Sequence, residues 1–115
     1  MTKETYTLTV AASDREALAL CLALGTLEAI RSSAWPVEAG IWTIARPAFW
    51  KALEEAGVPN EVREVFRGAD ELSAMSQLLG RAEVERQLEE WVTILKARLA
   101  VLPERTWCAQ WKDSE

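Results

Sequence analysis

Apolar positions recur at helical spacing in two long stretches of the chain. The first stretch repeats every three or four residues, at Ala17, Leu20, Leu24, Leu27 and Ile30, which is the spacing of one helix face. Ser13 and Glu16 precede it with the spacing of a capping box, in which two side chains bind backbone amides at a helix start. We therefore predict a first helix from about Asp14 to Ser32.

The other faces of this predicted helix are also apolar, because Leu18, Cys21 and Leu22 fill them. A helix that is apolar nearly all round is typical of one surrounded by other helices. We expect this helix to be the central element of the fold.

The second long stretch predicts a final helix from about Ala82 to Val101. Its apolar residues, Val84, Leu88, Trp91, Leu95 and Leu99, recur every three or four positions, and Pro103 forbids its continuation. Between the two long helices, prolines and glycines stand where helices begin and end. They predict four short helices, at about 37–45, 48–56, 60–67 and 70–79.

The two ends of the chain alternate between polar and apolar residues. Tyr6, Leu8 and Val10 alternate with threonines, a pattern that favours a short strand. The segment from Arg105 to Trp111 alternates similarly and is a candidate to pair with it. The predicted fold is mainly α: one compact helical domain over residues 1–115, of about six helices, with a short N-terminal strand and a possible C-terminal partner strand.

The net charge of the chain argues against some classes of binding partner. The formal charge is −5, and repulsion between acidic residues and phosphates argues against a nucleic-acid ligand. From Glu54 to Glu90 there are ten acids and four bases, a net charge of −6. A docking face for a basic protein is therefore predicted here, with Glu54, Glu55, Glu61, Glu64, Asp70 and Glu71 as its residues. The alternative is a solvated face that only keeps the protein soluble.

The sequence offers little for catalysis or metal binding. It contains no histidine and only two cysteines, Cys21 and Cys108, so the commonest general base and metal ligand are absent. We expect no enzymatic activity, no cofactor and no metal. With no secretory signal and no apolar run near the ~20 residues of a membrane span, we expect a cytoplasmic protein that does not enter a membrane.

Six tryptophans occur in the chain, and tryptophan is common both in cores and in the anchors of protein interfaces. Trp91 falls on the apolar stripe of the last helix, and Trp42 and Trp50 stand among apolar neighbours, so these three are assigned to the core. The remaining three, Trp35, Trp107 and Trp111, are candidates for a surface contact with a partner.

Several motifs between Tyr6 and Leu79 resemble a group of small bacterial proteins. They are the run Leu24-Gly25-Thr26-Leu27-Glu28-Ala29-Ile30, the segment Leu53 to Val58, and Gly68 with Asp70, Glu71 and Leu72. Such small acidic proteins are similar to the immunity proteins of toxin systems. The resemblance implies neutralisation of a cognate toxin by direct binding, and it brings no catalytic residues with it.

Two functions therefore remain open from the sequence. The first is a protein-binding module, with immunity against a bacterial toxin as its specific form. The second is a structural or regulatory helical subunit that acts as a homodimer through its apolar and tryptophan-bearing helices.

Overall fold

The computed structural model describes residues 4, 11–39, 43–55 and 57–102, and it is mainly helical in this part. Two short 3-10 turns accompany the helices, one before the first helix and one at residues 69–71. The elements, in chain order, are η1 (Ala12–Asp14), α1 (Arg15–Arg31), α3 (Pro47–Glu55), α4 (Asn60–Gly68), η2 (Ala69–Glu71), α5 (Leu72–Leu79) and α6 (Arg81–Val101). No strand occurs among these described residues, and the two predicted strands, at 6–10 and 105–111, lie outside them.

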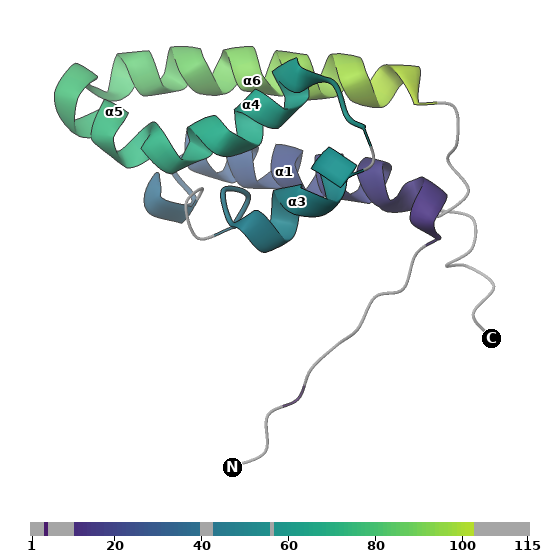
Figure 1. Ribbon diagram of the computed structural model, residues 1–115. Helices are drawn as coiled ribbons and strands as arrows, with labels where there is room; N and C mark the ends of the chain where they lie inside the picture. The colour runs from purple at the N-terminus through teal and green to yellow at the C-terminus, as the bar shows by residue number, and fades with distance from the viewer. Residues whose placement is uncertain (1–3, 5–10, 40–42, 56, 103–115) are drawn as a thin grey trace.

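Three rods make up the body of the molecule (Figure 1). Two are the long helices α1 and α6, and the third is formed by α4, η2 and α5, which follow one another along α6. Helix α1 runs antiparallel to α6, while α3 packs against both α1 and α4. The chain reverses between α5 and α6 at Gly80, whose φ of 88° is a backbone conformation that favours glycine.

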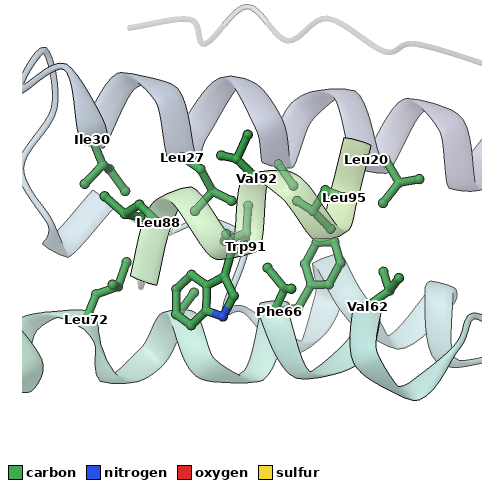
Figure 2. Packing of buried hydrophobic residues seen from close by; sticks show 14 of the residues in the cluster. Leu20, Leu27, Ile30, Val62, Phe66, Leu72, Leu88, Trp91, Val92 and Leu95 are labelled. Atoms are coloured by element: carbon green, nitrogen blue, oxygen red, sulfur yellow. The ribbon is translucent and has the colours of Figure 1, made fainter. Parts of the chain in front are cut away.

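The core lies where the three rods meet (Figure 2). Its largest fully buried side chains include Leu20 and Leu27 from α1, Phe66 from α4 and Leu95 from α6. Leu53 of α3 and Val58 close the core from the side. Trp91 is also buried, with 8% of its surface exposed, which confirms its assignment to the core.

Most helix boundaries agree with the pattern of prolines and glycines, but the segment 37–45 does not form the single helix predicted there. Residues 38 and 39 are helical, whereas 43–45 form a turn. The N–H of Arg46 donates to the carbonyl of Thr43 at 3.2 Å, which closes a turn three residues long, and Pro47 disfavours helical geometry in Arg46 before it. The predicted count of about six helices is therefore not supported.

The predicted capping box at the start of α1 is wrong. Ser13 lies in η1, and the residue at the N-cap of α1, Asp14, makes no side-chain capping hydrogen bond. Glu16 instead reaches across to α6, where its carboxylate accepts hydrogen bonds from Nε of Arg98 at 2.5 Å and from Nη2 at 3.1 Å. The carboxylate of Glu16 therefore binds a distant arginine instead of a backbone amide at the start of its own helix.

Helix α1 is central, but the other described helices do not surround it. It contacts both α6 and α3, yet Leu22 remains 53% exposed and Leu24 is only partly buried at the edge of the core. Among the described residues, α3 and α6 cover one side of α1, so its apolar residues on the other faces are less buried than the sequence predicts.

Two contacts tie α1 to α6 at opposite ends. At one end is the pair of Glu16 and Arg98, whose side chains are 13% and 26% exposed. At the other, Nη2 of Arg81 donates to the carbonyls of Ile30 and Arg31, at 3.0 and 2.9 Å. These carbonyls belong to the last turn of α1, where no further helical turn follows; the carbonyl of Ile30 also accepts from the N–H of Ser33 at 3.0 Å.

The hydrogen bond from Arg98 to Glu16 raises the pKa of the Arg98 guanidinium, partial burial lowers it, and the charge of the carboxylate adds to the increase. A raised pKa favours the charged form in the folded state. The stabilisation that this shift contributes is therefore present at neutral pH and is lost only as the pH rises through the pKa of the guanidinium in strong alkali.

Replacing Glu16 by alanine should lower the free energy of unfolding by about 1.5–3 kcal/mol, the range for hydrogen bonds to charged groups. Glu28→Ala is the matched control on the same helix, because its pair with Arg31 is exposed and should contribute less than about 0.5 kcal/mol. Urea unfolding of both variants measures the difference. Equal losses would mean that the Glu16 pair contributes no more than a surface pair.

Gly68 is required by the packing of Trp91. A Cβ at this position would lie 2.7 Å from Cζ2 of the Trp91 ring, whereas a Cβ at Gly25 in α1 would meet nothing within 4 Å. Gly68→Ala should therefore cost about 1–3 kcal/mol of stability through overpacking. Gly25→Ala, the matched control, should be neutral or stabilising by about 0.5–1 kcal/mol, because alanine favours the helix.

The same unfolding measurement checks this pair of variants. Combining Gly68→Ala with Trp91→Leu should remove the steric part of the loss, because the ring that the new methyl group meets is gone. A Gly68→Ala protein as stable as Gly25→Ala would contradict the contact.

Candidate protein-binding surface

The six acidic residues predicted to form a docking face lie on three successive parts of the chain. Glu54 and Glu55 end α3, Glu61 and Glu64 lie on α4, and Asp70 and Glu71 belong to η2. Because α3 packs on α4 and η2 continues directly from α4, these elements adjoin in space. Five of the six side chains are exposed, and Glu54 is half-buried.

Arginines neutralise part of this surface. Arg67 donates from Nη2 to Glu54 at 2.7 Å and from Nη1 to Glu64 at 3.1 Å. Arg63 approaches Glu54 at 4.0 Å. Arg67 therefore joins α3 to α4 and offsets the charge of two of the predicted acids.

The other four acidic residues have no arginine or lysine paired with them among the described residues. Glu55, Glu61, Asp70 and Glu71 are exposed, and each forms no ion pair with any residue that the structure describes. They are the part of the predicted face that is available to a basic partner.

A cleft of about 370 Å³ opens between the start of α3 and the junction of α4 with η2. It is lined by Ala45, Arg46, Pro47, Trp50, Arg67 and Asp70. The guanidinium of Arg67 lies 5.7 Å from the centre of the Trp50 ring, and Trp50 Nε1 donates to the carbonyl of Ala45 at 3.1 Å. Trp50 was assigned to the core; it packs against the core but also forms a wall of this cleft.

Sequence reasoning did not identify the two arginines of this cleft. Arg67 follows Glu64 by three residues, a spacing that brings side chains together on a helix, and that signal could have been read. The contact of Arg67 with Glu54 joins two helices, and no local pattern indicates it.

Trp35, one of the three tryptophans predicted at the surface, is 47% exposed. It lies in the loop after α1, where its backbone N–H donates to the carbonyl of Ala29 at 3.0 Å. Together with Pro36, Glu38, Ala39 and Thr43, it lines a shallow, largely apolar pocket of about 340 Å³. Trp107 and Trp111 lie outside the described residues, as does Trp42.

The described residues show no ready-made site for metal chemistry. Within this part of the chain, no group of three or more cysteine, aspartate or glutamate side chains is placed to hold a metal ion. None of the helices found there has the length and apolar character needed to cross a membrane.

No protein-family model matches the chain, and neither a curated protein nor a solved structure matches it.

The paired and unpaired acids should differ in their effect on stability. Glu54→Gln should lower the free energy of unfolding by about 0.5–1 kcal/mol, because it removes the charge that holds Arg67 between α3 and α4. Glu61→Gln, on an exposed residue that has no ion pair within the described part of the chain, should change the free energy of unfolding by less than about 0.5 kcal/mol. Thermal or urea unfolding tests the pair, and a larger loss at Glu61 would contradict the assigned contacts.

Proposed function

We propose that the chain is a non-enzymatic, cytoplasmic protein-binding module, and specifically an immunity protein that neutralises a bacterial toxin by direct binding. The observation that supports this most is the group of four exposed carboxylates on α3, α4 and η2 without ion pairs in the described structure: Glu55, Glu61, Asp70 and Glu71. The toxin as partner follows from the resemblance of residues 6–79 to immunity-like proteins.

The physical basis of the proposal is electrostatic steering. Carboxylates with no intramolecular partner produce a negative potential that draws a basic surface toward the correct orientation and raises the association rate. Arg67 contributes indirectly, because its bonds to Glu54 and Glu64 hold α3 against α4 and so keep the neighbouring carboxylates on one rigid support.

The absence of histidine from the sequence also supports binding over catalysis. An immunity protein needs only to cover the surface of its toxin, and a rigid acidic face is sufficient for that. The competing interpretation, a face that serves only solubility, predicts no dependence of any specific association on these residues.

The experiment begins with the chain as bait in its native host. A captured partner is then purified, and its toxicity is measured with and without the chain. The proposal predicts a toxin whose activity the chain suppresses at equimolar ratio. A captured protein without toxic activity would overturn immunity as the function while leaving a binding role.

The association rate with the partner should fall steeply as ionic strength rises, by about tenfold or more, because salt screens the exposed carboxylates. Reversing Glu61 and Glu71 together to lysine should slow association further, while the melting curve barely changes. Stopped-flow kinetics at several salt concentrations measures both effects.

Glu89→Lys provides the matched control, since Glu89 is an exposed carboxylate that belongs to α6 and not to α3, α4 or η2. It should slow association much less per charge reversed. A rate independent of salt and of the Glu61 and Glu71 reversals would eliminate the acidic face and leave Trp35 and its pocket as the better contact.

A further inference from the structure

Helix α1 carries an apolar stripe on the side away from its buried face. The stripe recurs at intervals of three and four residues and consists of Leu18, Cys21, Leu22 and Gly25. Leu22 is 53% exposed, Gly25 is exposed, and the other two are half-buried. Leu18 and Gly25 each stand two residues before a fully buried leucine of α1, a separation of about 200° around the helix axis.

The lack of charge on this stripe is unusual for a helix at the surface. Such a helix normally presents polar or charged residues on the side away from the core. No charged residue occurs on α1 from Ala17 to Leu27, whereas the exposed residues of α6 include Glu85, Glu89 and Lys96. The sequence of α1 therefore suits a helix covered on both sides, although α3 and α6 cover one side of it within the described ranges.

The segment directly before α1 matches the stripe in its chemistry and its place in the chain. Residues 5–10 lie outside the part of the chain that the structure describes. They contain no charge, and their apolar residues, Tyr6, Leu8 and Val10, alternate with threonines. Only Ala11, which is exposed, separates them from η1. The segment therefore starts at the surface, next to the helix whose stripe is open.

We propose that residues 5–10 fold back along α1 and cover its apolar stripe, with Leu8 over Leu18 and Tyr6 over Leu22. Alternate residues of an extended chain are about 6.6 Å apart, and residues four apart on a helix are about 6 Å apart along its axis, so the two sets are in register. Tyr6 reaches about 17 Å from Ala11, and Leu22 lies about 18 Å from Ala11 through η1 and α1. The proposal is independent of the toxin-binding function.

Other occupants match the stripe less well. A second copy carries a charge of −5 and repels the first, whereas a segment attached through one residue has an effective concentration on the order of millimolar. A basic partner is attracted to carboxylates, and the stripe has none. The segment after Leu102 starts at the same end of α1 and α6 (Figure 1), but charged residues flank its tryptophans, at Glu104, Arg105, Lys112 and Asp113.

Leu8→Lys and Thr7→Lys form a matched pair of variants, because successive side chains of an extended segment point to opposite sides. In urea unfolding of the full chain, Leu8→Lys should raise the equilibrium constant for unfolding about tenfold, since it removes a buried apolar side chain. Thr7→Lys should raise this constant less than about twofold, as a surface change does. Equal effects of the two variants would overturn the proposal.

Tyr6 allows a direct test, because it is the single tyrosine of the sequence and its ring is a unique NMR probe. Nuclear Overhauser contacts should join this ring to the methyl groups of Leu22 and not to those of Leu78, which is 81% exposed on α5. The effects of Tyr6→Ala and Leu22→Ala on the unfolding constant should depart from multiplicativity by about threefold or more, as expected for residues in contact. Tyr6→Ala and Leu78→Ala, the control pair, should multiply.

Each alternative occupant has its own signature in the same spectra. Contacts of Leu22 with Trp107 or Trp111 instead of Tyr6 would identify the C-terminal segment and overturn the proposal. Contacts between differently labelled chains, with a mass approaching twice 12.9 kDa, would identify a second copy and overturn it too. So would the absence of any contact from Leu22 to residues 5–10. Toxin binding enters none of these measurements, so this proposal and the proposed function fail separately.

Discussion

The structure depends on the antiparallel pairing of α1 with α6. The Glu16–Arg98 pair fixes one end of these helices, and Arg81 holds the other through the last carbonyls of α1. Between these two contacts the apolar faces enclose Leu27 and Leu88, which are fully buried. Hydrogen bonds are directional, whereas apolar packing alone allows two helices to shift along each other. The two contacts therefore fix the register of α1 against α6, and the other helices pack onto this pair.

The rod of α4, η2 and α5 relies on that register. Trp91 on α6 must arrive opposite Gly68, where the absence of a side chain makes room for the indole ring. Phe66 then lies fully buried beside it, and α3 closes the side of the core. The acidic residues of α4 and η2 thus lie on a framework whose geometry depends on Gly68 and Phe66 beside them in sequence and on the distant Trp91.

Much of the helical layout could be predicted from the sequence because its signals are local. Asn60 begins α4 and Leu79 ends α5, as Pro59 and Gly80 indicate. The predictions that were wrong concern contacts between distant residues. Glu16 fits a capping box by its spacing but binds Arg98, 82 residues away. Leu22 lies in an apolar run but is exposed. In the site, the acids could be found by counting charge, but the neutralisation of Glu54 by Arg67 could not. That contact depends on how α3 meets α4, and periodicity within one helix carries no information about it.

The Gly80 reversal has a consequence for how the molecule assembles. It joins α5 to α6 through a single residue, so the contacts of this helical hairpin are close in sequence. Closing so short a loop costs little conformational entropy. The pairing of α1 with α6 instead closes a loop that spans up to 82 residues. The α5–α6 hairpin can therefore form from contacts close in sequence, whereas the packing of α1 on α6 needs contacts between distant residues. The formation of these distant contacts completes the cooperative fold.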